Sequence, residues 1–282
     1  MSKFYLENEY GERIDLQNDD LYCLVSNPSG WGIDKDSNYI AIGDRFVKNY
    51  INNKQNEFSM ALNFTKPKAF EKLQKVSNFI LNADKLCLIY APELESGGEF
   101  RRDVEVSSFI QLYDVDGLLR YQLKLKATSL FYDRNFTKFF VDRTDGEFRF
   151  DFRWDVRFND YANREMILNN NGHVDAGFSF EIYGYSNIPK VSIFKDEALI
   201  KEIVINCEIL EDEKVEYCSL DGNLYVNKVD GNGNKTSLYN TFDLNDDVFF
   251  KIPRGEVQVK FTADSGTMNQ IYFTLYKFYE VV

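Results

Sequence analysis

Residues 104–126, VEVSSFIQLYDVDGLLRYQLKLK, decide the fold class of this chain. Two apolar runs flank the turn residues Asp116 and Gly117, as in a β-hairpin. In the second run apolar and polar side chains alternate, which is the period of a half-buried strand. One face carries Leu119, Tyr121, Leu123 and Leu125, and the other carries Arg120, Gln122, Lys124 and Lys126. The stretch therefore predicts a long antiparallel hairpin with a basic outer face.

A second stretch, FRFDFRWDVRF at residues 148–158, alternates still more strictly. Its apolar side chains fall on one face, and its arginines and aspartates alternate along the other. Such a charged face either discourages edge-to-edge aggregation or forms a charge-complementary contact between subunits. The sequence leaves both interpretations open.

From Gly177 to the C-terminus, short apolar runs are separated by turns that contain glycine. This spacing is typical of an antiparallel β-sandwich or barrel. The runs that we interpret as strands are 178–183, 190–194, 199–205, 214–220, 223–229, 237–242, 248–252, 256–261 and 271–278.

A single helix is predicted, in the first half of the chain. Thr65 or Lys66 can cap it, Pro67 suits its first turn, and Asn82 helps to end it. Its apolar stripe consists of Phe70, Leu73, Val76 and Ile80.

Because the helix lies only in the first half, we place a domain boundary between Asp142 and Gly146. Residues 1–143 are then a β domain with a helix and a hairpin arm, and residues 144–282 are an antiparallel β-sandwich. The predicted fold class is mainly β, with one α-helix.

Composition limits the function classes. The 282 residues carry a formal net charge of -12, so neither nucleic acid nor an anionic membrane surface is an expected partner. No apolar run approaches the ~18 residues of a membrane span. The start, MSKFYLENEYGERIDL, lacks the apolar core of a signal peptide, so we expect synthesis in the cytoplasm. The four cysteines have no C-x-x-C spacing, and we interpret them as reduced thiols.

Residues that usually carry chemistry are sparse. The only histidine, His173, has no second histidine with which to share a metal, and no G-x-S-x-G elbow accompanies it. A loop that begins at Asp230 has the alternating oxygens of a calcium site. It carries Lys235 where such a loop needs glycine and Thr241 where it needs glutamate. We therefore expect a protein that is not an enzyme and has no cofactor and no metal.

Two further function classes stay open beside a structural one. In a carbohydrate-binding or adhesion module an exposed ring stacks on a sugar, and Tyr183, Tyr185 and Trp154 are candidates for it, although such rings are also core residues. A hydrolase would need a deep pocket with facing carboxylates, and no particular pair stands out.

Taken in order, several segments resemble those of the distal tail proteins (Dit family), baseplate hubs of phages that infect Gram-positive hosts. FYLENEYGERIDL and NPSGWGI are similar to the start of that family. The helix and the hairpin FRRDVEVSSFIQLYDVDGLLRYQLKLKATSLFYD resemble the rest of its N-terminal domain. GHVDAGFSFEIYGYSNIPKV and FFKIPRGEVQVKF resemble its second half, except that Ile188 separates Asn187 from Pro189.

The resemblance implies a structural protein of the virion tail. Its N-terminal domain would close a hexameric ring, with the hairpin arm reaching a neighbouring subunit, and its C-terminal domain would be a galectin-like sandwich. The ring would join the tail tube protein to the tail-tip protein and present receptor-binding proteins. Around His173 we find no galectin-type His/Asn/Arg cluster, so sugar binding does not transfer.

A cyclic ring needs head-to-tail contacts, in which one patch meets a different patch on the next copy. The basic face of the hairpin can meet acidic surface there, because opposite charges favour register and association. An acidic channel wall would also repel DNA that passes through. The predicted interface residues are Arg101, Arg102, Val104, Val106, Leu119, Arg120, Tyr121, Leu123, Lys124, Leu125 and Lys126.

Overall fold

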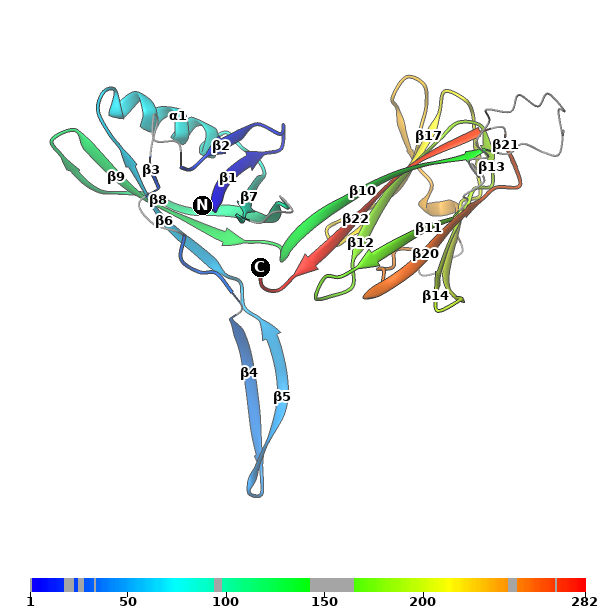
Figure 1. Cartoon of the computed structure of the whole chain (residues 1–282), viewed down its shortest axis with the longest axis horizontal. Coiled ribbons are helices and arrows are strands. Elements are labelled where there is room, and N and C mark those ends of the chain that lie inside the picture. The colour runs from blue at the N-terminus through cyan, green and yellow to red at the C-terminus, as the bar shows by residue number, and fades with distance from the viewer. Residues whose placement is uncertain are drawn as a thin grey trace, which may run out of the picture. The chain divides into compact units, whose positions relative to one another are not determined.

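The computed structural model describes residues 2–17, 23–24, 28–32, 34–93, 98–142, 165–242, 248–266 and 268–282. The chain divides into two compact units, unit 1 (Met1–Asp133 with Tyr279–Val282) and unit 2 (Arg134–Phe278) (Figure 1). Antiparallel strands dominate both units, and the described residues hold a single α-helix. The predicted mainly β class with one helix is therefore confirmed. The boundary expected after residue 143 stays a prediction, and the stretch 148–158 lies outside the described residues.

Unit 1 is built on strands whose inner faces close over one hydrophobic core. The long strand β8 (Phe100–Val115) joins its two halves, because residues 100–104 pair with β7 and residues 104–115 pair with β9. The order across the sheet is β2 (Arg13–Asp15), β1 (Lys3–Asn8), β7 (Leu86–Ala91), β8, β9 (Leu118–Ala127), β6 (Glu57–Phe64) and β3 (Cys23–Leu24).

Helix α1 (Ala69–Leu81) covers β6 and β9 and ends at Asn82, as predicted. The predicted start was wrong, because the residue that caps the helix is Lys68, in a left-handed conformation. The predicted stripe was also wrong at Phe70, which is 63% exposed, while Ala69 is buried in its place. Ala69 lies four residues before Leu73 and continues the stripe around the helix better than Phe70 does.

Strands β4 (Lys35–Ile42) and β5 (Arg45–Asn53) pair with each other and with no other described strand. They form a two-stranded ribbon that extends away from the sheet of unit 1 (Figure 1). At its base the Lys54 amide donates to the Asp34 carbonyl oxygen at 2.8 Å, which closes the ribbon where it leaves the sheet.

Unit 2 is a β-sandwich, since side chains from two antiparallel sheets share one core. A short third sheet lies beside them, with the order β16 (Glu208–Ile209), β13 (Ser186–Asn187) and β21 (Ser265–Gly266). The second sheet has the order β11 (Glu165–Asn170), β20 (Gly255–Thr262), β14 (Lys190–Lys195) and β15 (Ala198–Val204). The first runs β10 (Phe131–Asp142), β22 (Met268–Tyr279), β12 (Gly177–Tyr183), β17 (Lys214–Leu220), β18 (Asn223–Val229) and β19 (Lys235–Ser237).

Two of the strands predicted in this half were wrong. The run 237–242 begins at the last residue of β19 and continues into a 3-10 helix, η1 (Tyr239–Thr241). The run 248–252 forms only a single bridge, between Ile252 and Ala176. Both runs contribute buried side chains to the core, so their apolar character reflects burial in loops rather than strand pairing.

Candidate interaction surfaces

The predicted hairpin 104–126 exists as β8 and β9, but its second strand is an interior strand of unit 1. β9 is hydrogen-bonded to β6 on one side and to β8 on the other. Val104, Leu123 and Leu125 are fully buried in the core of their own unit. Val106, Leu119 and Tyr121 pack partly against the same core, and the ring of Tyr121 lies 4.9 Å from that of Phe109. These apolar side chains therefore stabilise unit 1 itself.

The predicted cations are also engaged within unit 1. The Arg101 guanidinium donates to a Glu7 carboxylate oxygen at 2.6 Å, and Lys124 forms an ion pair with Glu57 at 3.3 Å. Arg120 donates to the Tyr113 hydroxyl at 3.2 Å. Lys126 is exposed. An interface role of these residues stays a prediction, and Lys126 is the one among them most open to a neighbour.

Arg102 has the most unusual environment of the predicted set. Its guanidinium carbon lies 5.2 Å from the ring centre of Phe58 and 4.8 Å from that of Phe131, as in a cation–π contact. Its Nε donates to the Ser129 carbonyl oxygen at 2.8 Å. Burial lowers the pKa of Arg102 to about 10. This cation is part of the core and is not a surface group.

The ribbon of β4 and β5 is a surface that our sequence reasoning missed. Six of its large side chains are exposed, and Phe46 at the tip is exposed by 78%. Directly opposite residues point to the same face of a hairpin. Ile40 therefore shares one face with Val47, and Phe46 shares the other with Ala41. Both faces of the ribbon are thus apolar and open.

A two-stranded ribbon of this kind is not expected to be stable by itself. An isolated two-stranded hairpin is marginal in water, because no second layer buries its side chains. Contiguous exposed apolar surface on a protein commonly marks a contact site. The sequence signal was present in the turn Gly43-Asp44 between the runs YIAI and RFV. Its apolar residues do not follow one simple alternation, since they occupy both faces.

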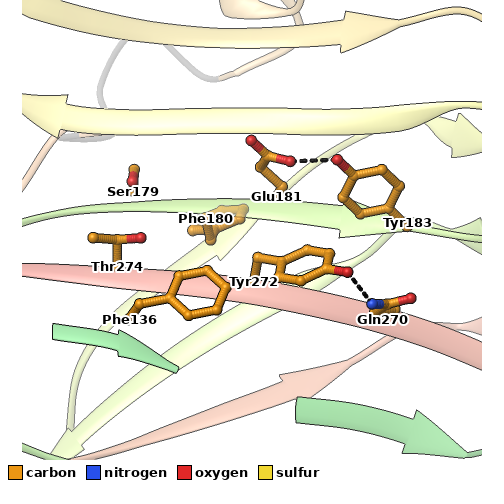
Figure 2. Close-up of a pocket in the computed structure, with 8 residues that line it drawn as sticks. All are labelled: Phe136, Ser179, Phe180, Glu181, Tyr183, Gln270, Tyr272 and Thr274. Carbon is orange, nitrogen blue, oxygen red and sulfur yellow. Dashed lines mark hydrogen bonds between the residues drawn. The ribbon is translucent and has the colours of Figure 1, made fainter. Parts of the chain in front are cut away.

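Unit 2 carries a hollow of about 430 Å³ on the outer face of its first sheet (Figure 2). Neighbouring positions on β12 and β22 form the floor, where Glu181 lies opposite Tyr272 and Ser179 lies opposite Thr274. The Phe136 ring, on β10, stacks on Tyr272 with 5.7 Å between the ring centres. The remaining lining residues are Phe180, Tyr183 and Gln270.

A hydrogen-bonded network fixes one wall of this hollow. The Tyr183 hydroxyl donates to a Glu181 carboxylate oxygen at 2.5 Å, and Lys214 donates to both groups, at 3.1 and 3.2 Å. Burial and the hydrogen bond to Glu181 raise the pKa of Tyr183. Burial lowers the pKa of Lys214, but its bonds to Glu216, Tyr183 and Glu181 raise it above the ordinary value overall. The wall is therefore ordered in advance and nearly balanced in charge.

Three further features singled out from the sequence are the loop that begins at Asp230, the residue His173 and the cysteines. The Asp230 carboxylate accepts hydrogen bonds from the backbone amides of Asn232 and Asn234 at 2.9 and 2.8 Å, so this loop is a hairpin turn between β18 and β19. The His173 amide donates to the Phe278 carbonyl oxygen at 2.7 Å. Cys87, Cys207 and Cys218 are free thiols.

Neither a metal site nor a membrane helix emerges from the described part of the chain. Within it, no group of three or more His, Cys, Asp or Glu side chains is placed to hold a metal ion. No helix there combines the length and apolar character that crossing a membrane requires.

Comparison with known proteins adds a family and a fold. Residues 3–128 match the family described as distal tail protein, N-terminal domain. A chain in the structure of the phage P2 baseplate, in its activated conformation with Ca, superposes with a TM-score of 0.69 at 12% identity and full coverage of both chains. The Dit protein of phage SPP1, described as a paradigm of the hub adsorption apparatus in phages infecting Gram-positive hosts, gives a TM-score of 0.58 at 13% identity. It covers 96% of this chain and 98% of its own. No curated protein matches the chain by sequence.

The chain is thus a structural protein of the phage tail, of the baseplate hub type. Its residues 3–128 carry the N-terminal domain of the distal tail protein family. The resemblance read from the sequence is confirmed.

Proposed function

We propose that this protein closes a hexameric ring at the end of the tail, and that the ribbon of β4 and β5 makes the contact between neighbouring copies. The observation that carries the proposal is the exposure of apolar side chains on both faces of the ribbon, including Ile40, Ile42 and Phe46. A ribbon whose two faces are both covered by a neighbouring copy needs apolar side chains on both faces. We therefore assign the role of the interface arm to β4 and β5, where the sequence had suggested β8 and β9.

A ring contact between identical copies is head-to-tail, so the ribbon of one copy meets a different patch on the next. The ribbon suits such a role because it reaches beyond the sheet of its own unit while its base is held. Asn56 donates through its amide to the carbonyl oxygens of Gly30 and Gly32 at 3.3 and 2.7 Å, and Lys35 pairs with Glu280 at 3.5 Å. A fixed base limits the entropy that is lost when the ribbon docks.

In the assembled tail, the ring would connect the tail tube protein to the tail-tip protein, and the sandwich would present receptor-binding proteins. The galectin-like character of the sandwich and the division at residue 143 belong to this proposal, as does synthesis in the host cytoplasm. The net charge of -12 supports an acidic channel wall, which would let DNA pass without binding it.

Light scattering on the purified protein tests the ring. The wild-type chain is expected to have the mass of a closed ring, and Phe46→Asp is expected to release monomers, because a charge cannot be buried in an apolar contact without a large cost. Phe70→Asp is the matched control, since Phe70 on α1 is exposed to a similar degree (63% against 78%) but lies outside the ribbon. A wild-type monomer at all concentrations, or a ring that survives Phe46→Asp, would refute the proposal.

A further inference from the structure

The hollow on the first sheet of unit 2 has no part in the proposed ring contact, and its chemistry has a different character. It combines an exposed ring with hydroxyl, carboxylate and amide groups on an open sheet face (Figure 2). We propose that it binds a neutral saccharide, with one sugar ring stacked on Phe136 and the sugar hydroxyls bonded by Glu181, Ser179 and Thr274.

The aromatic part of the site is exposed and supported. Phe136 is 60% exposed, so much of its ring is open to a ligand. It stacks on Tyr272 at an interplanar angle of 26°, and the Lys138 ammonium lies 4.9 Å from the centre of the same Tyr272 ring. The platform therefore exists before a ligand arrives. A pyranose presents a face of C–H groups that packs on such a ring.

The polar part of the site has hydrogen-bonding capacity left over. Within the described part of the chain, the hydrogen bonds that Glu181 accepts from Tyr183 and Lys214 both end on its Oε2 atom, and none reaches Oε1. The Ser179 and Thr274 hydroxyls, directly opposite each other on β12 and β22, also have no side-chain partner among the described residues. Together these three groups offer two hydroxyl donors and a carboxylate acceptor beside the ring.

The charge and size of the hollow favour one class of ligand. Among the described residues that line the hollow, Glu181 is the only carboxylate. Its charge is paired with Lys214, and its second oxygen would repel a phosphate or another carboxylate. A neutral polyol satisfies the leftover donors and acceptors without that repulsion. A volume of about 430 Å³ is at the lower end of the range for small-molecule sites, roughly 300–1,000 Å³, and fits one or two sugar rings.

A peptide from a protein partner is the competing occupant, and the polarity of the floor argues against it. The cores of protein–protein contacts are depleted in charged and small hydroxyl side chains. Here Glu181, Ser179 and Thr274 line the hollow beside the ring of Tyr272, so the surface that a peptide would cover is polar.

Saturation-transfer NMR on the full-length protein tests the site with four neutral probes: D-glucose, D-galactose, L-rhamnose and N-acetyl-D-glucosamine. At least one probe is expected to receive saturation. Phe136→Ala and Glu181→Gln are each expected to weaken its binding about fivefold or more, which corresponds to the ~1 kcal/mol of one ring contact or one hydrogen bond. Phe70→Ala, which removes an exposed ring from unit 1, is expected to leave binding unchanged.

Ser179→Ala is a milder second variant, because it removes one hydroxyl and leaves the strand intact. The proposal is overturned if no probe receives saturation, or if saturation survives Phe136→Ala. It is also overturned if Phe136→Ala lowers the mass of the assembly, since the face would then contact protein. Loss of the ring in Phe46→Asp with sugar binding retained would separate this site from the ring contact.

Discussion

A methyl group placed on Gly30 would lie 2.1 Å from the carbonyl oxygen of Glu57. Gly30 belongs to the loop NPSGWG, and Glu57 begins β6, directly after the ribbon of β4 and β5. The φ angle of Gly30 is +97°, a conformation that residues with a Cβ atom rarely adopt. Glycine is required here because the loop passes against the backbone at the base of the ribbon.

Gly30→Ala is therefore expected to lower the free energy of unfolding of unit 1 strongly. Gly32→Ala is the matched control, because Gly32 has nearly the same φ angle, +96°, and open space around its Cα atom. Gly32→Ala therefore measures only the cost of backbone strain, about 1–3 kcal/mol. Gly30→Ala adds a steric clash of at least about 1 kcal/mol more. Urea unfolding of both variants checks this, and equal losses of stability would show that the close approach to Glu57 has no energetic weight.

Leu123→Ala is expected to destabilise unit 1 by about 2–5 kcal/mol, because it opens a cavity beneath the interior strand β9. The same substitution in a free interface arm would weaken assembly and leave the stability of the unit unchanged. Unfolding by urea and mass by light scattering are to be measured on the same sample. A stable, monomeric Leu123→Ala variant would contradict the placement of β9 in the core.

The ion pair between Glu7 and Arg101 predicts a pH dependence of stability. Burial raises the pKa of Glu7, but hydrogen bonds from Arg101 and Arg13 lower it below the ordinary value overall. A carboxylate with a lowered pKa in the folded state contributes stability above its unfolded pKa, near 4.5, and the contribution is lost as the pH falls toward the lowered value.

Wild type is therefore expected to be more stable than Glu7→Gln at neutral pH, and the difference is expected to shrink as the pH falls below the unfolded pKa of Glu7 toward its lowered folded-state pKa. Other carboxylates titrate in both proteins, so the difference isolates Glu7. Denaturant unfolding at a series of pH values measures it. A difference that stays constant across this range would show that the charge of Glu7 does not matter.

Local pattern was enough to predict the helix, the hairpin of β8 and β9 and most of the strands after Gly177, and it failed where tertiary packing decides. Leu119 to Leu125 alternate as a strand must, but alternation reveals one buried face and says nothing of whether one or both edges are paired. β6 occupies the second edge of β9, and that long-range pairing turned the expected arm into a core strand. Phe70 was assigned to the buried stripe because it is apolar, yet the smaller Ala69 faces the sheet.

The candidate surfaces were predicted less completely than the fold. Tyr183 was singled out as an aromatic residue, but its partners in the hollow come from strands that are distant in sequence, such as Phe136 on β10 and Tyr272 on β22. The ribbon escaped notice because its apolar side chains occupy both faces, which hides the period of two. A surface that only a neighbouring copy would cover has no signature of burial within a single chain.

Photo-crosslinking from the tip of the ribbon shows directly whether the ribbon contacts a neighbouring copy. A benzophenone amino acid is placed at position 46, and chains labelled with light and heavy nitrogen are mixed before assembly. If the ribbon joins neighbouring copies, we expect covalent dimers that contain one light and one heavy chain, with the crosslinked peptide in unit 1 of the partner copy. The same amino acid at position 70 is expected to give no such product. Assembled protein that yields only crosslinks within one chain from position 46, or equal yields from both positions, would show that the ribbon does not join the copies.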